Sequence, residues 1–92
     1  MNSPESSERP LLEFPCEFPI KVLGENVAGF VAAVSAVALE HDAGFDASTI
    51  ELRPSKGDRY LGVTLIVTAT DREQLDNLYR ALSSHPMVKV VL

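Results

Sequence analysis

Apolar and polar residues alternate in four stretches of the chain, with the two-residue period of a β-strand that buries one face. The alternation predicts strands over residues 18–24, 47–54, 60–69 and 87–92. The third stretch is the strongest because it is long and rich in β-branched residues. In the last stretch, Val88, Val90 and Leu92 are expected on the buried side.

Apolar residues spaced three and four apart mark two further stretches as amphipathic helices. We expect Asn26 to be the N-cap of the first helix and Gly44 to follow its end. The second helix is expected to begin at Thr70 or Asp71, each of which has Glu or Gln three residues later, as in a capping box. The two apolar stripes comprise Val27, Phe30, Val31, Val34, Val37, Ala38 and His41 in the first helix, and Leu75, Leu78, Tyr79 and Leu82 in the second.

The resulting order is strand, helix, strand, strand, helix, strand. It predicts the α+β class and a ferredoxin-like split βαβ sandwich (βαββαβ), with a four-stranded antiparallel sheet and two helices on one face. Residues 1–10 are rich in Ser, Glu and Pro, which predicts a disordered tail. Residues 11–92 are expected to form a single ferredoxin-like domain, because 92 residues are enough for one domain only.

The charge balance and the composition disfavour several classes of partner and location. Thirteen acidic and eight basic residues give a formal charge of −5, which disfavours nucleic acids and anionic membranes. No stretch approaches the roughly 18–20 apolar residues of a membrane helix. The start of the chain does not resemble a secretory signal, and Cys16 is the only cysteine. These features favour a cytoplasmic protein.

The segment RPSKGDRYLG concentrates positive charge where the predicted order places a hairpin loop. Its candidate binding residues are Arg53, Lys56, Gly57, Arg59 and Tyr60. A phosphate-binding loop of the GxxxxGK[ST] type is excluded, because this segment joins two strands and has a different glycine pattern. Gly, Ser and Asp are turn-forming residues for local reasons, so a charged hairpin turn is favoured over an anion site.

Three segments resemble the YbeD-like family of small uncharacterised bacterial proteins: LLEFPCEFPIKVLG, the tyrosine-bearing strand after SKGD, and QLDNLYRAL with the VKVVL end. The resemblance covers residues 11–92. It implies a fold similar to ACT regulatory domains, a regulatory role without an established activity, and a possible link to lipoate metabolism. Family members usually place the tyrosine two residues after the hairpin glycine. Here Gly57 and Tyr60 are three apart, so a shifted or bulged turn is expected.

The resemblance to ACT domains directs attention to the loop after the first strand, formed by Gly24, Glu25, Asn26 and Val27. A small carboxylate effector could bind there, because glycine permits close approach and a helix N-terminus attracts anions. Glu25 opposes an anion in the same loop. Strand termination by Gly24 and helix capping by Asn26 are therefore the favoured interpretation.

No catalytic residue, metal site or cofactor is predicted. Cys16 has no histidine nearby in sequence to activate it. The run Ser83-Ser84-His85 cannot form a triad, because adjacent residues cannot adopt the required geometry. His41, Asp42 and Asp46 lack the spacing of a metal site. An enzyme is accordingly disfavoured.

The sheet face opposite the helices is expected to mix apolar and charged residues. RNA recognition by such a face requires stacked aromatic residues, and only Tyr60 is available. A half-apolar face is typical of a surface that meets another protein. We therefore expect a regulatory or adaptor domain that binds a protein partner or self-associates through this face or an edge strand, and the carboxylate sensor is the alternative. The alternation assigns to the face Lys21, Leu23, Thr49, Glu51, Arg53, Tyr60, Thr64, Ile66, Thr68, Lys89 and Val91.

Overall fold

A computed structural model describes residues 13–92 of the chain. Residues 1–12, which include the predicted tail and the first two residues of the predicted domain, lie outside the described part. The order βαββαβ is confirmed, with two short 3-10 turns added. The elements are β2 (Cys16–Glu25), α1 (Phe30–His41), a 3-10 turn (Ala47–Thr49), β3 (Glu51–Pro54), a second 3-10 turn (Lys56–Asp58), β4 (Tyr60–Ala69), α2 (Arg72–Ser83) and β5 (Val88–Val91).

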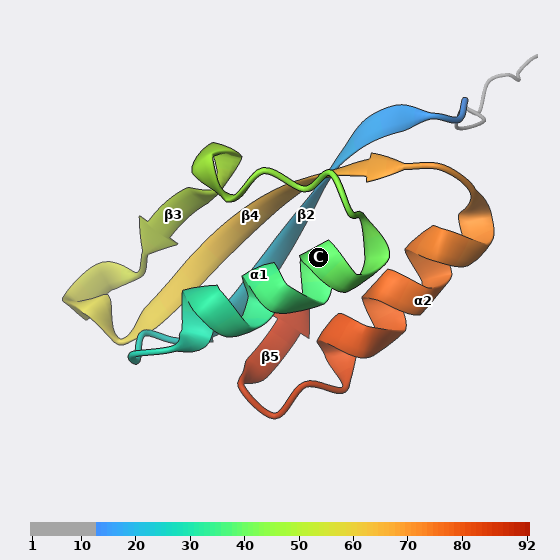
Figure 1. Ribbon diagram of the computed structural model, residues 1–92. Helices are drawn as coiled ribbons and strands as arrows, with labels where there is room; N and C mark the ends of the chain where they lie inside the picture. The colour runs from blue at the N-terminus through green and yellow to red at the C-terminus, as the bar shows by residue number, and fades with distance from the viewer. Residues whose placement is uncertain (1–12) are drawn as a thin grey trace, which may run out of the picture.

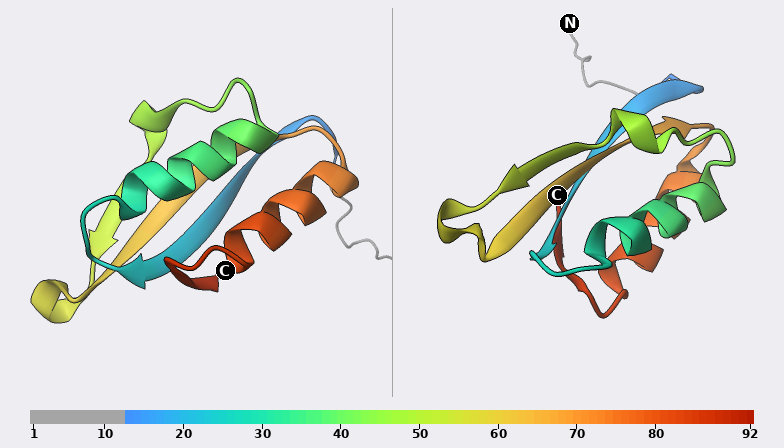
Figure 2. Two further views of the ribbon diagram at one scale, coloured as in Figure 1. Left: turned by 60° about the horizontal axis from the view of Figure 1, so that its bottom comes forward. Right: turned by 60° about the vertical axis from the view of Figure 1, so that its left-hand side comes forward.

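The strands form one antiparallel sheet in the order β3-β4-β2-β5, and both helices pack on the same face (Figures 1 and 2). The central strands β2 and β4 pair along their whole length, from Cys16 opposite Ala69 to Glu25 opposite Tyr60. The predicted ferredoxin-like class is therefore confirmed. The opposite face of the sheet is covered by none of the helices in residues 13–92, and the β3–β4 hairpin reaches past both helices (Figure 1).

The hydrophobic core lies between the helices and the sheet. Every second residue of β2 and β4 faces it, and each helix contributes a stripe at the predicted spacing. Burial of each large side chain stabilises the fold by about 1.5–3 kcal/mol. The largest fully buried side chains are Ile20, Val22, Phe30, Val34, Val63, Leu65, Val67, Leu78 and Leu82.

The first helix begins later than predicted, at Phe30, and its N-cap is Gly29 rather than Asn26. Asn26 still belongs to the strand pairing, because its backbone N–H donates to the Arg59 carbonyl at 2.9 Å. The chain then turns through Gly29, which has a φ of 91° in the left-handed region that favours glycine. Val27, predicted on the buried stripe, consequently lies outside the helix and is 49% exposed.

The N-cap of the second helix is Asp71, one of the two predicted candidates, and its carboxylate accepts from the Gln74 backbone N–H at 2.8 Å. The return bond of a capping box is shifted by one residue, since Gln74 Oε1 accepts from the Thr70 N–H at 2.7 Å. Gln74 Nε2 donates to the carbonyls of His41 and Thr68. One glutamine thus ties the start of α2 to the ends of α1 and β4.

Two strand predictions are corrected by the structure. The stretch 47–54 is a strand only from Glu51, because residues 47–49 form a 3-10 turn capped by the Asp46 side chain. The pairing of β5 with β2 shifts register between Leu23 and Gly24 of β2. Val91 consequently lies opposite Val22 on the helix side of the sheet, and Val90 lies opposite Leu23 on the other side. This bulge reverses the sides predicted for Val90 and Val91, because simple alternation does not continue across an irregular pairing.

Candidate functional site

The two loops singled out in the sequence lie side by side at one end of the sheet. Glu25 pairs with Tyr60 at the ends of β2 and β4. Just beyond them, Asn26 Nδ2 donates to the Asp58 carbonyl at 3.1 Å, in addition to the backbone bond to Arg59. Asn26 therefore anchors the hairpin loop rather than capping a helix.

The hairpin loop satisfies its own turn geometry. Gly57 and Asp58 both have positive φ, 81° and 60°, within the 3-10 turn. The Ser55 N–H donates to the Tyr60 carbonyl at 2.8 Å, and Ser55 Oγ accepts from the Tyr60 N–H at 2.9 Å. The Arg59 guanidinium lies 5.7 Å from the Tyr60 ring centre, within cation–π range. Local bonds account for this turn without a ligand.

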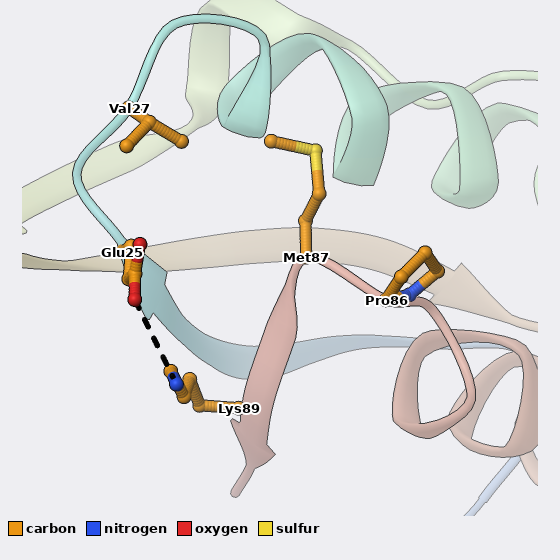
Figure 3. A pocket seen from close by; sticks show the side chains of 5 residues that line it. All are labelled: Glu25, Val27, Pro86, Met87 and Lys89. Carbon is orange, nitrogen blue, oxygen red and sulfur yellow. Dashed lines mark ion pairs between the residues drawn. The ribbon is translucent and has the colours of Figure 1, made fainter.

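The strand-helix loop is occupied by the protein's own groups. A Cβ placed on Gly24 would lie 2.5 Å from Phe30 Cζ and 2.6 Å from the Met87 carbonyl oxygen. The close approach that Gly24 allows is therefore made by the core. Glu25 pairs with Lys89 at 3.8 Å, with both side chains 53% exposed, so the pair contributes little stability. A hollow of about 230 Å³ lies beside the pair (Figure 3), lined by Glu25, Val27, Pro86, Met87 and Lys89.

The strand register shows which residues lie side by side on the open face of the sheet, which is the face away from the helices. One row runs from Val90 through Leu23 and Gly62 to Arg53, and the next contains Lys21, Thr64 and Glu51. Ile66 and Pro19 form the row after that. Thr49 and Val91 are absent from this face, contrary to prediction, whereas Val90 belongs to it.

Gly62 is the residue that the sequence analysis missed. It stands on the open face between Tyr60 and Thr64, and it leaves the centre of the sheet hollow. Two adjoining hollows, of about 180 and 220 Å³, share Lys21, Arg53 and Gly62. The signal was present in the sequence, because the alternation that assigns Tyr60 and Thr64 to this face assigns Gly62 as well. Arg53 thus lies with Lys21 across the sheet and not with the hairpin cations.

Prolines stand at the outward position of two sheet edges. The backbone groups of Lys21 bond to those of Leu92 on the β5 side. Pro19, two residues earlier, points to the same side where β5 no longer pairs. In the hairpin the Ser55 N–H bonds toward β4, so Pro54 points outward. Because proline has no N–H, neither edge offers a complete hydrogen-bonding ladder to an added strand.

The titratable groups suspected in the sequence have structural partners. His41 Nδ1 donates to the Val37 carbonyl, and the Asp42 carboxylate accepts from the backbone N–H of Gly44 and Thr68. Hydrogen bonds from Ser48 lower the pKa of Asp46. Within residues 13–92, no three His, Cys, Asp or Glu side chains are arranged to hold a metal ion.

Cys16 and the 83–85 run lie apart from the open-face hollow. Cys16 is half-buried at the start of β2. Ser84 Oγ donates to the Arg80 carbonyl, and His85 Nδ1 accepts from the Met87 N–H. Burial raises the pKa of Tyr79, whose ring meets Phe18 edge-on at 6.4 Å on the helix side of the sheet. No helix of the described chain is long and apolar enough to cross a membrane.

The comparisons with known proteins agree on one family. The profile described as "Protein of unknown function (DUF493)" matches residues 9–92. The chain is 54% identical to a UPF0250 protein of Bordetella pertussis and 55% identical to a UPF0250 protein of Leptothrix cholodnii, in each case over 92% of this chain and 93% of the relative. The solution structure of protein HP0495 from H. pylori superimposes with a TM-score of 0.76 at 14% identity, covering 100% of this chain and 97% of that one. That likeness supports the ferredoxin-like fold.

Proposed function

The chain belongs to the DUF493 family of proteins of unknown function, and we propose that it is a non-enzymatic regulatory or adaptor domain that acts through protein contacts made by the open face of its sheet. We place this role in the cytoplasm, which the single cysteine favours. The partner is either another protein or a second copy of the chain.

The composition of the open face carries the proposal. Leu23, Ile66 and Val90 stand on the sheet side away from the helices, and Val90 is 44% exposed. Covering apolar surface stabilises a complex by about 25 cal/mol per Å² of area removed from water. Charged residues surround these side chains, as in interfaces whose apolar centre has a polar rim. The two prolines at the edges favour contact through the face over strand addition.

The test compares two matched substitutions. Ile66→Glu places a charge on the open face, whereas Leu39→Glu places the same charge on α1, where Leu39 is 47% exposed. Each purified variant is immobilised and used to capture proteins from a cell extract, and self-association is measured by light scattering. We expect Ile66→Glu to lose the contacts made by the wild type and Leu39→Glu to keep them. Equal retention by both variants, each shown to be folded by circular dichroism, would exclude the open face.

A second candidate function is sensing of a small carboxylate at the loop formed by Gly24, Glu25, Asn26 and Val27. The hollow beside this loop favours it, because Lys89 supplies a cation there (Figure 3). Glu25 already pairs with Lys89, so a carboxylate has to displace it. A sensor gains thermal stability with its ligand, since a ligand that binds only the native state stabilises it.

A thermal-shift screen against amino acids, short carboxylic acids and lipoate tests the sensor. We expect Glu25→Gln, which frees Lys89, to increase any shift, and Lys89→Gln to abolish it. A shift that survives Lys89→Gln excludes this loop. The hairpin residues Lys56, Gly57, Arg59 and Tyr60 are adjacent, and Lys56→Gln distinguishes a contribution from that loop.

A further inference from the structure

The hollow over Gly62 is bordered by two basic side chains from different strands. Lys21 of β2 lies opposite Thr64, and Arg53 of β3 lies opposite Gly62. These positions are two strand spacings and two residues apart, which places the two Cα atoms ~12 Å apart. Both side chains are long enough to reach one group held above Gly62.

These two cations differ from Lys89 in their surroundings. Within residues 13–92 one ion pair is formed, between Lys89 and Glu25. Lys21 and Arg53 have no such partner in that part of the chain, although Glu51 borders the same hollow. A carboxylate placed between these two cations is attracted by both, whereas Glu51 at the edge of the same hollow opposes it.

The hollow has two parts of different character. Lys21 and Arg53 border both parts; Glu51 and Thr64 also border one part, and Leu23 and Pro54 also border the other. Its two parts measure about 180 and 220 Å³, and each is smaller than the roughly 300–1,000 Å³ of a usual small-molecule pocket. Its size suits a single side chain presented by a covering surface.

We infer that the hollow over Gly62 receives a carboxylate side chain, Asp or Glu, of a partner protein. The carboxylate lies between Lys21 and Arg53, and an apolar neighbour of that residue packs on Leu23 and Pro54. This inference rests on the proposed function, because it names the chemistry of the partner at the open face. Charge-assisted hydrogen bonds from Arg and Lys to a carboxylate are stronger than those to a neutral amide, so the site discriminates Glu from Gln.

The test is a titration of the full chain, labelled with ¹⁵N, with the peptide acetyl-Leu-Glu-Leu-amide and separately with acetyl-Leu-Gln-Leu-amide. We expect saturable shifts of the amide signals of Leu23, Gly62 and Thr64, with about tenfold weaker binding of the Gln peptide. Added salt should weaken binding of the Glu peptide alone. Equal binding of both peptides, the absence of shifts at millimolar peptide, or shifts centred on the hairpin or Lys89 would overturn the inference.

Variants of the hollow complete the test. Arg53→Gln and Lys21→Gln should each weaken binding of the Glu peptide, and the hairpin variant Lys56→Gln should not. Gly62→Val should remove binding by filling the hollow, because a Cβ on Gly62 meets only the Arg53 carbonyl oxygen, at 3.5 Å, and the strand can accept it. Unchanged binding by folded Gly62→Val overturns the inference.

The experiments distinguish failure of the carboxylate inference from failure of the proposed function. If Ile66→Glu abolishes protein capture while the Glu and Gln peptides bind alike, the open face acts as proposed and the carboxylate inference fails. If dilution of the protein alone moves the same amide signals, a second copy occupies the face and the inference of a different partner fails. If Ile66→Glu leaves capture intact, the proposed function fails.

Discussion

Gly24 and Gly62 provide a matched pair for testing how tightly the central strands pack. They lie in β2 and β4, on opposite faces of the sheet. In Gly24→Ala the new methyl lies 2.5 Å from Phe30 Cζ and 2.6 Å from the Met87 carbonyl oxygen, far inside ordinary van der Waals contact. Phe30 is fully buried and the second atom belongs to the backbone, so neither moves freely. Overpacking of this kind costs about 2–3 kcal/mol.

Gly62→Ala is the control, because its nearest neighbour is the Arg53 carbonyl oxygen at 3.5 Å. Replacing a strand glycine with alanine there should stabilise the fold by about 0.5–1 kcal/mol, since glycine loses more backbone freedom on folding. The assay is urea unfolding followed by circular dichroism, with thermal unfolding as a second measurement. We expect the Tm of Gly24→Ala to fall by roughly 10–20 °C, from about 4–8 °C per kcal/mol for a domain of this size. Equal changes in the two variants would refute the packing argument.

Four further perturbations follow from particular contacts and from burial. Phe30→Ala should lower the free energy of unfolding in urea by about 3–5 kcal/mol, because Phe30 is fully buried. In the control Leu39→Ala the free energy of unfolding should change by less than about 1 kcal/mol, because Leu39 is 47% exposed. Similar losses in the two variants would contradict the assigned helix faces. Asp71→Ala should lower the free energy of unfolding by about 1 kcal/mol through the lost N-cap. Gln74→Ala should lower it by more, because Gln74 also donates to the carbonyls of His41 and Thr68. A smaller loss in Gln74→Ala would contradict the role of Gln74 in joining α2 to α1 and β4. Hydrogen bonds from Ser48 lower the pKa of Asp46, so their contribution to stability is present above the unfolded pKa and is lost as pH falls through the folded pKa. NMR titration should show an Asp46 pKa below the ordinary range of aspartate that rises in Ser48→Gly; no change in that variant would contradict the cause given. Burial raises the pKa of Tyr79, so the stability that this residue contributes to the fold is present below its unfolded pKa and is lost as pH rises through its folded pKa. Absorbance titration of the wild type and of Tyr79→Phe should show that the substitution removes a transition above the ordinary range of tyrosine; removal of a transition within that range would contradict it.

The element order was predictable because local periodicity coincides with burial. Val34 and Ala38 of α1, and Leu75 and Leu78 of α2, lie in the core where the three- and four-residue spacing predicts them. The strand 60–69 has its predicted bounds, since alternation continues without interruption along a fully paired central strand. The Asp71 cap was also predictable, because a cap depends on residues three apart in sequence.

Two of the errors, at Asn26 and at the end of the chain, occurred where a distant pairing decides the local structure. Asn26 has a good side chain for an N-cap, but its backbone and amide bond to the hairpin residues Arg59 and Asp58, 33 and 32 positions away. The sides of Val90 and Val91 depend on a register shift against β2, which the sequence of the last strand does not encode by itself.

The open-face hollow could be predicted only in part. Lys21 and Arg53 were assigned to the correct face by alternation, but their proximity depends on the strand order β3-β4-β2 and on the register. Gly62 carries no side chain and so was not counted among the residues of the face. Its role is to leave space, which becomes evident only when its neighbours on both adjacent strands are known.

The most direct test of the open face as the contact surface is photocrosslinking in living cells. A photoreactive phenylalanine is introduced at Ile66 on the open face and, as the control, at Leu39 on α1. We predict discrete adducts from the Ile66 position, with a mass that identifies a partner protein or a second 10.0 kDa chain, and none of these adducts from Leu39. Adducts from Leu39 alone, or the same adducts from both positions, would contradict the account.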